Sequence, residues 1–363
     1  MMTRTKSLFF LILFISLTQV GIAQELPLSK LVWEVNKVNL GTVFEESGPQ
    51  LATFRFTHTQ DSVFVLERVW TDCGCTTAEY TQDSLNVGEE GIVSVSFNPS
   101  TTAGYFSKLV VVKGNLQDTQ DTLYIEGVSI PAVSDPELVY TARKGDLGFR
   151  LSKVNMGDVF TNEPKIKDVE FFNFGPSVFF RDSLQVYGPE YIRVDLIQDS
   201  VPPMTRGLLQ ISYNGQEKGD LGFFEEGISL TFGDSIAQQM AVLANVFEFY
   251  PAFSKENLRV VPNLSIDKIE IDLKEISANT VQNQLVTLTN KGQKSLEIKK
   301  IQGNCDCLVL KVPQTELAPG ESMTMEITFD PKGRKGIDQR NIYIFSNDPL
   351  NPVQTLVIKS RIK

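Results

Sequence analysis

Residues 286–292 read Val-Thr-Leu-Thr-Asn-Lys-Gly, so that apolar side chains occupy alternate positions ahead of an asparagine and a glycine. The same arrangement recurs at residues 169–175, and residues 54–60 carry it with histidine and glutamine in place of asparagine and glycine. Alternation of this kind predicts a half-buried β-strand, with one face toward a core and the other toward solvent. The chain therefore contains one strand-and-turn unit in three copies.

The copies extend well beyond this strand. The middle copy opens at 154–160 much as the first opens at 38–44, and all three finish on an alternating strand, at 123–127, 240–244 and 356–360. The first and last copies also stay in register without a gap, which indicates a tandem repeat of one module. At a constant offset of 232 residues, the shared positions are Cys73 and Cys305, Cys75 and Cys307, Gly88 and Gly320, Phe97 and Phe329, Pro99 and Pro331, and Gly104 and Gly336.

Short alternating runs separated by Gly, Pro and Asn turns predict an all-β fold. About seven short strands in roughly 100 residues is the usual size of an immunoglobulin-like (Ig-like) module. We therefore expect three tandem Ig-like antiparallel β-sandwich domains, at residues 31–132, 147–249 and 262–363, after a signal peptide. The intervening stretches, 131–146 and 250–261, are short and contain proline, which favours a semi-rigid string of modules.

The first residues follow the plan of a secretory signal peptide. Arg4 and Lys6 precede an apolar run at 8–17, and Gly21 and Ala23 supply small residues before a cleavage site. The alternative is an N-terminal membrane anchor, but the run is shorter than the ~20 residues that a spanning helix needs. We expect removal of residues 1–23 and a periplasmic or secreted protein, in a Gram-negative envelope.

The charge of the remaining chain limits its partners. Without residues 1–23 it keeps 32 Lys and Arg against 44 Asp and Glu, a net charge of −12. An acidic surface repels phosphate backbones, so nucleic acid is not expected as a partner. No later stretch is long and apolar enough to span a membrane, and residues 332–336 predict a basic turn between strands. Other envelope or extracellular proteins are the expected partners, and no cofactor is expected.

The four cysteines fall in two matching loops, Cys73-Gly74-Cys75 and Cys305-Asp306-Cys307. On an extended strand the two thiols of a pair share one face, with Cα atoms about 6.6 Å apart, near the upper limit for a disulfide. A bond within a pair requires a bend, which Gly74 permits more easily than Asp306. Four interpretations remain open: a structural pair that is closed or reduced, a labile redox disulfide, a metal site and a cysteine nucleophile.

Metal binding and catalysis have less support from the residues. A structural zinc site usually has four Cys or His ligands, whereas each loop supplies two thiolates. A nucleophilic cysteine usually needs a histidine, but the one histidine, His58, holds the turn position of Asn173 and Asn290. The acidic pairs Glu89-Glu90 and Glu225-Glu226 lie beside glycine and predict solvated turns. We therefore expect no catalytic residue, with Cys73, Cys75, Cys305 and Cys307 kept as candidates for a disulfide, a redox site or a metal site.

Together these landmarks resemble an uncharacterised bacterial family, known as domain of unknown function fifteen-seventy-three. Besides the opening strand, the motifs that carry the resemblance are Cys73–Thr76 in the first module and Cys305, Cys307, Pro319-Gly320 and Ser346-Asn347-Asp348-Pro349 in the third. The resemblance implies an Ig-like sandwich akin to the ASH and major-sperm-protein superfamily, often exported in Gram-negative envelopes, with no established activity. The middle module departs from it, because Tyr187-Gly188-Pro189 stands near the expected cysteine loop.

The function that we expect is an exported, non-enzymatic binding or scaffold protein of the cell envelope, acting through sandwich edges and loops. The alternative is a thiol-disulfide or metal-handling protein that uses the two Cys-x-Cys loops. A carbohydrate-binding string lacks an aromatic platform, because Trp33 and Trp70 are the only tryptophans. Labelling of free thiols in protein from its native compartment, with parallel metal analysis, separates the first two functions.

Overall fold

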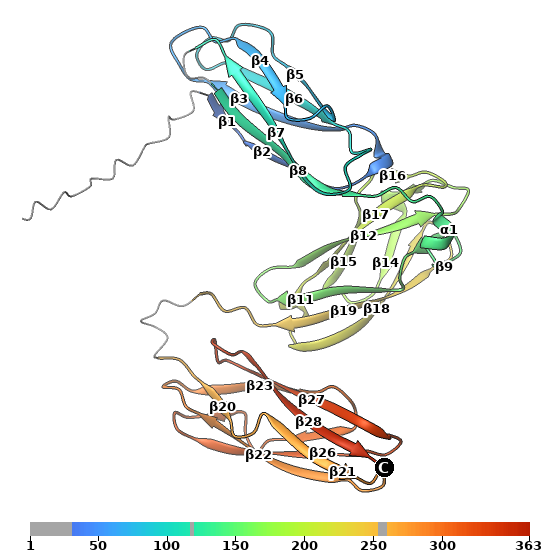
Figure 1. Ribbon diagram of the computed structural model, residues 1–363, viewed down its shortest axis with the longest axis vertical. Coiled ribbons are helices and arrows are strands. Elements are labelled where there is room, and N and C mark those ends of the chain that lie inside the picture. The colour runs from blue at the N-terminus through green and yellow to red at the C-terminus, as the bar shows by residue number, and fades with distance from the viewer. Residues whose placement is uncertain (1–30, 117–119, 253–259) are drawn as a thin grey trace, which may run out of the picture. The chain divides into compact units, whose positions relative to one another are not determined.

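The structure is a computed structural model that describes residues 31–116, 120–252 and 260–363. The predicted signal peptide, residues 1–23, lies outside the described residues. The chain divides into two compact units, residues 1–132 and 133–363. The first unit holds one hydrophobic core and the second holds two separate cores, each between the sheets of a β-sandwich (Figure 1). The predicted all-β, Ig-like fold class is confirmed.

The first sandwich consists of two four-stranded sheets, ordered β1-β3-β6-β5 and β2-β8-β7-β4. Alternate residues of both sheets point into one core: Phe54 and Phe56 are buried, and Arg55 between them is exposed. Its strands are β1 Leu31–Trp33, β2 Lys37–Phe44, β3 Gln50–His58, β4 Leu66–Thr71, β5 Thr76–Tyr80, β6 Glu90–Phe97, β7 Gly104–Gly114 and β8 Gln120–Ile130.

The third sandwich repeats this arrangement with sheets ordered β20-β22-β26-β24 and β21-β28-β27-β23-β25. Val286 and Leu288, from the strand that opened the sequence analysis, are both 0% exposed in its core. Its strands are β20 Leu264–Ile266, β21 Glu270–Ile276, β22 Gln282–Asn290, β23 Leu296–Gly303, β24 Leu308–Lys311, β25 Glu316–Leu317, β26 Ser322–Phe329, β27 Gly336–Ser346 and β28 Val353–Ile362.

The middle sandwich has sheets ordered β15-β17-β12-β10-β9 and β11-β19-β18-β14, with a small ribbon of β13 and β16. Its strands are β9 Ala142–Lys144, β10 Leu147–Phe149, β11 Lys153–Phe160, β12 Lys165–Asn173, β13 Phe179–Phe180, β14 Leu184–Tyr187, β15 Ile192–Leu196, β16 Ser200–Val201, β17 Arg206–Tyr213, β18 Gly222–Phe232 and β19 Gln238–Phe247. The α-helices of the described chain are α1 Pro136–Val139 and α2 Gly215–Lys218. No helix among these described residues is long and apolar enough to cross a bilayer.

The middle sandwich begins earlier than its sequence predicts. The stretch at 131–146 was expected to be a linker, but its strand β9 pairs with β10 in the sandwich sheet. Tyr140 from the same stretch is 1% exposed and stacks on Phe172, with ring centroids 5.5 Å apart. The linker prediction failed because this stretch is short and contains proline, whereas its packing depends on residues distant in the sequence.

Each sandwich also contains one parallel strand pair, which explains the repeated Val-Asn-x-Gly motif. Strands β2, β11 and β21 pair in parallel with the last strands β8, β19 and β28, and each pair has an irregularity after its second residue pairs. There the side chains of Asn39 and Asn155 accept hydrogen bonds from the backbone N–H of Gly41 and Gly157, both at 2.8 Å. Both glycines have positive φ, 68° and 71°, which glycine adopts without steric cost.

The polar residue that ends the opening strand is buried in all three sandwiches. His58, Asn173 and Asn290 are each 0% exposed, and each bonds the carbonyl oxygen four residues on, at 2.6, 2.8 and 2.8 Å respectively. The two asparagines also accept a backbone N–H two residues on, at 2.9 Å. This side chain therefore holds the turn together from inside, where an unpaired carbonyl would cost free energy.

The Ser346-Asn347-Asp348-Pro349 motif has a similar structural role in the third sandwich. Asp348 is 0% exposed, and its Oδ2 accepts the backbone N–H of Leu264 at 3.0 Å while Oδ1 accepts that of Leu350 at 3.0 Å. The carboxylate thus joins the loop before β28 to the start of β20. The motif is explained by this tie between two segments far apart in the sequence.

We predict that His58→Asn preserves or raises the stability of the first sandwich, whereas His58→Leu lowers its free energy of unfolding by about 1–3 kcal/mol. Nε2 of His58 must donate to the carbonyl of Ser62, and Nδ1 has no hydrogen-bond partner among the described residues. Asparagine can make both of the bonds seen in the other copies, whereas leucine makes neither. Urea unfolding followed by tryptophan fluorescence measures this, because Trp33 and Trp70 both lie in the first sandwich. Equal loss of stability in both variants would contradict the assigned role.

Candidate functional site

The two Cys-x-Cys loops occupy the same place in the first and third sandwiches. One joins β4 to β5 and the other joins β23 to β24, so that each lies where the chain crosses between sheets. Both pairs are closed as disulfides, Cys73–Cys75 and Cys305–Cys307, with Cα atoms 5.3 and 5.2 Å apart. The backbone is bent below the ~6.6 Å of an extended strand, and Asp306 accommodates the bend as Gly74 does.

The backbone around the two disulfides is hydrogen-bonded in the same way. The carbonyl of the first cysteine accepts the N–H three residues on, and the carbonyl of the second accepts an N–H from the end of the neighbouring strand. These bonds fasten each loop to the start of an edge strand. They run from Thr76 N to Cys73 O (3.3 Å), from Asn98 N to Cys75 O (2.8 Å), from Leu308 N to Cys305 O (3.3 Å) and from Asp330 N to Cys307 O (2.9 Å).

The side chains around the first disulfide are neutral hydroxyls. Thr76 Oγ1 lies 3.8 Å from Cys73 Sγ and 3.5 Å from Cys75 Sγ. Thr71 Oγ1 lies within hydrogen-bond distance of the carbonyl oxygens of Cys73 (3.1 Å) and Thr76 (2.9 Å). Both hydroxyls help to hold the loop, and the cysteines are half-buried.

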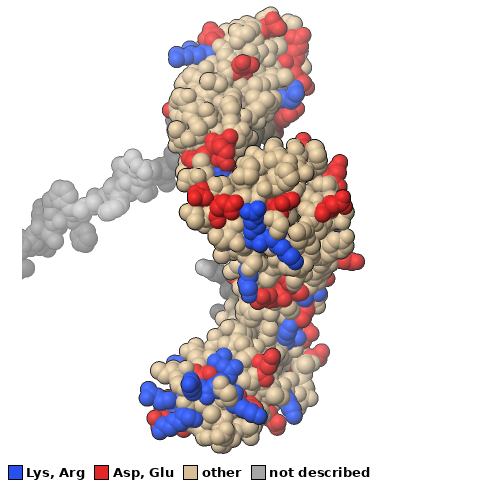
Figure 2. All heavy atoms as spheres, turned by 90° about the vertical axis from the view of Figure 1, so that its right-hand side faces the viewer, with Lys and Arg blue, Asp and Glu red and all other residues tan. Residues whose placement is uncertain are grey.

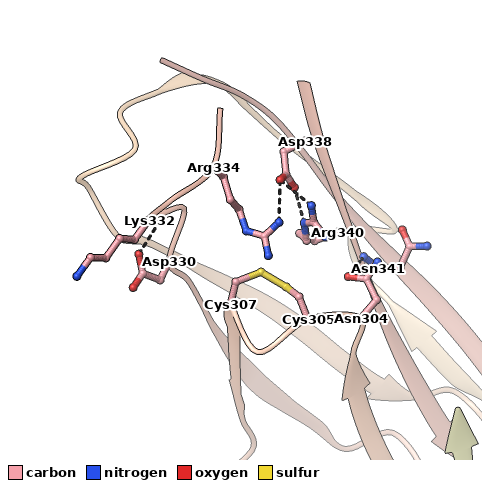
Figure 3. The surroundings of a disulfide bond; sticks show 9 residues. All are labelled: Asn304, Cys305, Cys307, Asp330, Lys332, Arg334, Asp338, Arg340 and Asn341. Carbon is pink, nitrogen blue, oxygen red and sulfur yellow. Dashed lines mark hydrogen bonds and ion pairs between the residues drawn. A yellow bond between two sulfur atoms is a disulfide. The ribbon is translucent and has the colours of Figure 1, made fainter. Parts of the chain in front are cut away.

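The surroundings of the third sandwich's disulfide are ionic (Figure 3). Asp338 on β27 has a side chain that is 7% exposed, and its carboxylate accepts from both Nε and Nη2 of Arg340, the latter at 2.6 Å. Arg334, from the turn before β27, donates to the same carboxylate at 3.4 Å. The hydrogen bond from Arg340 is the main cause that lowers the pKa of Asp338 below its ordinary value.

The sequence analysis placed Arg334 in a basic turn and did not find its acidic partner. At the offset of 232 residues Asp338 aligns with Phe106, which packs against Phe97 with ring centroids 4.3 Å apart. A charged residue at a core position of the repeat was therefore the signal that this end of the sandwich differs. Its ionic character followed only once Asp338 was seen to lie between two arginines (Figure 3).

The middle sandwich crosses between its sheets at the same place without cysteines. The segment Tyr187-Gly188-Pro189 leads from β14 to β15, which belong to different sheets. Its core nevertheless contains fully buried residues from both sheets, such as Leu209 and Val242. This fold therefore does not require a disulfide at the crossing.

Each disulfide loop leads directly into a strand at the edge of its sheet, β5 or β24. Hydrogen bonds from Asn98 N to Cys75 O and from Thr81 N to Ile92 O show that alternate residues of β5 face β6. The antiparallel pattern therefore turns the backbone of Ala78 away from β6, toward the open edge. By the same alternation, the bond from Asp330 N to Cys307 O turns the backbone of Leu310 toward the open edge of β24.

The remaining candidates from the sequence have structural positions. The pair Glu225-Glu226 was expected in a solvated turn but lies within β18, where the Glu226 carboxylate accepts from Lys218 Nζ at 2.7 Å and from Tyr191 OH at 2.9 Å. His58 is buried in its turn, away from any cysteine loop partner role, and stacks on Phe64 at 5.2 Å. Within the described part of the chain, no group of three or more His, Cys, Asp and Glu side chains is placed to hold a metal ion.

A family model described as "Protein of unknown function (DUF1573)" matches residues 31–129 and 264–362. These are the first and third sandwiches, which carry the disulfides. No curated protein matches the sequence. The middle sandwich lies outside both matched ranges, in agreement with its lack of the cysteine motif.

Several solved structures are similar at low sequence identity. A protein of unknown function from Porphyromonas gingivalis W83 is 16% identical and covers 60% of this chain and 100% of its own, with a TM-score of 0.43. The I67–I69 fragment of titin is 10% identical over 92% and 98% of the two chains, with a TM-score of 0.21. The ASH/PapD-like domain 7 of human CEP192 is 9% identical over 32% and 92%, with a TM-score of 0.24. Glycoside hydrolases are also among the matches, so these similarities concern the fold and not an activity.

We predict that Asp338→Asn lowers the free energy of unfolding of the third sandwich by about 1–3 kcal/mol near neutral pH, because two buried arginine contacts lose their counter-charge. The folded-state pKa of Asp338 is depressed, so its stabilisation is present above the unfolded value of about 3.9 and disappears as pH falls through the folded pKa. Wild type and variant should therefore converge in strong acid. Urea unfolding followed by far-UV circular dichroism at both pH values checks this, with tryptophan fluorescence of the first sandwich as the unchanged control. A difference that is independent of pH would contradict the ion-pair assignment.

Proposed function

This chain belongs to the family described as protein of unknown function (DUF1573), and from that premise we propose that it is a non-enzymatic binding or scaffold protein of the cell envelope. It engages other envelope or extracellular proteins through the edges and loops of its sandwiches. The observation that carries the proposal is the pair of edge strands, β5 and β24, that follow the disulfide loops.

An edge strand whose backbone points outward is a template for one more strand. The backbone groups of Ala78 and Leu310 face away from the neighbouring strands, and an extended segment of a partner can pair with them by β-augmentation. In this mode the main-chain hydrogen bonds supply affinity, and the exposed side chains on alternate positions supply specificity. Both sandwiches that match the family model present such an edge beside a disulfide.

The disulfides support binding by ordering the edge before a partner arrives. Each closes a loop immediately before the edge strand and is hydrogen-bonded to its first residue. A segment that is already ordered loses less conformational entropy on association, so more of the contact energy appears as affinity. The disulfide loop and the edge strand thus form one rigid presentation surface.

The two edges present different chemistry to a partner. On β5 the exposed side chains are Thr77 and Glu79, whereas the aligned positions of β24 carry Val309 and Lys311. The first sandwich, residues 31–132, has 5 Lys and Arg against 13 Asp and Glu, and the third, residues 260–363, has 14 against 12. Several basic side chains gather on one face of the third sandwich, at the foot of Figure 2. The two edges therefore select segments of different charge.

The non-enzymatic assignment is supported by how the motif residues are used. The cysteines bond to each other, the polar residues at the turn position bond backbone carbonyls, and Asp348 bonds backbone N–H groups. Each of these groups stabilises the local fold. The side chains that remain available at the loop ends are suited to contact with another protein surface.

We predict that a photo-crosslinking amino acid placed at Thr77 or Val309 captures a partner in the native compartment, and that the same residue at Thr53 does not. Thr53 is exposed on β3, which has neighbours on both sides in its sheet, and so provides a matched control. Ala78→Pro should abolish capture at Thr77, because proline removes the outward N–H and places its ring at the edge. Mass spectrometry of the crosslinked products gives the readout.

The fold of the Ala78→Pro variant is checked by its tryptophan fluorescence, since both tryptophans lie in the first sandwich. Capture that is equal at Thr53 and Thr77, or that survives Ala78→Pro in a folded protein, would rule out recognition by an added strand. Capture at one of the two edges alone would assign the binding to that sandwich.

We also predict that the protein isolated from its native cells lacks residues 1–23 and fractionates with the periplasm or the medium. The basic start, the apolar run and Ala23 support export, and disulfides persist in oxidising compartments. Intact-mass measurement after cell fractionation provides the test. A full-length chain in the cytosolic fraction would contradict the proposed location.

A further inference from the structure

The two disulfides of this chain have the same backbone frame and different electrostatic surroundings. Both pairs are half-buried, and their Cα separations differ by only 0.1 Å, being 5.3 and 5.2 Å. Steric access and loop geometry are therefore closely matched. What differs is the charge of the side chains placed around the sulfur atoms.

The charge difference is concentrated in the turn that follows β6 or β26. At the offset of 232 residues, three cations of the third sandwich, Lys332, Arg334 and Lys335, take the place of Ser100, Thr102 and Ala103 in the first. Lys332 and Lys335 are exposed, and Arg334 is partly exposed. The sandwiches as wholes differ in the same direction, since the first is strongly acidic and the third has a slight excess of basic residues.

Arg334 brings this positive charge to the disulfide itself. Figure 3 shows its guanidinium group between the Cys305–Cys307 bond and Asp338, with the exposed turn of Lys332 on the same side. Arg340 already holds the Asp338 carboxylate through two hydrogen bonds, and Arg334 contacts it at 3.4 Å. Two guanidinium groups share one carboxylate, so a positive charge remains uncompensated by Asp338 beside the sulfur atoms.

A thiolate is the attacking species in thiol-disulfide exchange, and a second thiolate is the leaving group. Nearby cations raise the local concentration of an anionic attacker and stabilise the charge that develops on the leaving sulfur. The acidic first sandwich has the opposite effect on an anion, and the hydroxyl of Thr76 carries no charge. The same electrostatic argument therefore favours exchange at one disulfide and disfavours it at the other.

We propose that Cys305–Cys307 is a thiol-disulfide exchange site for anionic thiols, whereas Cys73–Cys75 is a structural disulfide. In the exchange, the sulfur of the anionic thiolate bonds to one cysteine sulfur, and the Cys305–Cys307 bond breaks. Its electron pair leaves on the other cysteine as a thiolate, beside Arg334. A second equivalent of the thiol attacks the mixed disulfide, so that two electrons reduce the pair to two thiols and the reagent becomes a disulfide.

The test uses the full, oxidised chain with glutathione as the anionic probe, at low ionic strength and near neutral pH. Samples are acid-quenched and alkylated at intervals, and mass spectrometry measures the reduced fraction of each pair separately. Cys305–Cys307 should be reduced at least about threefold faster than Cys73–Cys75, and added salt should shrink the ratio. Cysteamine, a cationic thiol, should show a smaller ratio or a reversed one.

Exchange of the turn residues between sandwiches provides matched variants. The triple substitution Lys332→Ser, Arg334→Thr and Lys335→Ala should remove the preference of glutathione for Cys305–Cys307. The reciprocal substitution Ser100→Lys, Thr102→Arg and Ala103→Lys should speed reduction of Cys73–Cys75. Arg334→Lys, which keeps the charge, should retain most of the preference, and circular dichroism confirms that each variant is folded.

Two results would overturn the proposal. One is an equal rate of reduction at the two disulfides with glutathione. The other is a preference for Cys305–Cys307 that is the same for glutathione and cysteamine and unaffected by salt, because a merely more accessible or more strained disulfide behaves in that way. Neither result affects the proposed binding function, which requires the edge strands and not the reduction of a disulfide.

Discussion

Each sandwich is held together by the burial of alternate side chains between two sheets, and the other features depend on this constraint. Because the sheets share one core, the chain must cross from one sheet to the other within about 100 residues several times. The crossings bring backbone polar groups close to the core, where they need partners. The buried residue at positions 58, 173 and 290 supplies these partners at one crossing, and the Cys-x-Cys loops stiffen another.

The same constraint explains where function is located. Core positions are occupied by apolar side chains in all three sandwiches, so differences between the sandwiches are concentrated at loops and edges. The disulfide end of the third sandwich is an exception to this rule, because Asp338 and Arg340 hold positions on the inward face of β27. There an ion pair replaces the aromatic contact of Phe97 and Phe106, and a conserved backbone frame acquires a different electrostatic environment. A single repeat can thus give two sites of unlike chemistry.

Much of this architecture was predictable from the sequence, since period-two alternation is a local signal. The all-β class and the opening strands followed from residues such as Phe54, Phe56, Val286 and Leu288, all of which are buried. The third copy of the Asn-x-Gly turn was missed, because Asp272 and Lys274 occupy its positions with a hydrogen bond of 2.9 Å and a φ of 59° at the lysine. There the backbone conformation is kept and the residue type is not, so the pattern disappears from the sequence.

The candidate site was predictable only in its cysteines. Spacing alone gave an extended estimate that argued against closure, whereas the bent loop brings both pairs within bonding reach. The partnership of Arg334 with Asp338 joins a turn to a strand across the end of the sandwich, and no local periodicity encodes it. The start of the middle sandwich at β9 was missed for the same reason, because strand pairing depends on contacts that are remote in sequence.

The central claim is that β5 and β24 present unpaired backbone toward the solvent in the free protein. Residue-resolved amide hydrogen exchange by nuclear magnetic resonance tests this most directly. The account predicts that the amides of Thr77 and Val309 are protected, because they face β6 and β26, while those of Ala78 and Leu310 exchange rapidly. Equal, strong protection of all four amides in the isolated chain would show that the edges are already covered, and would contradict the account.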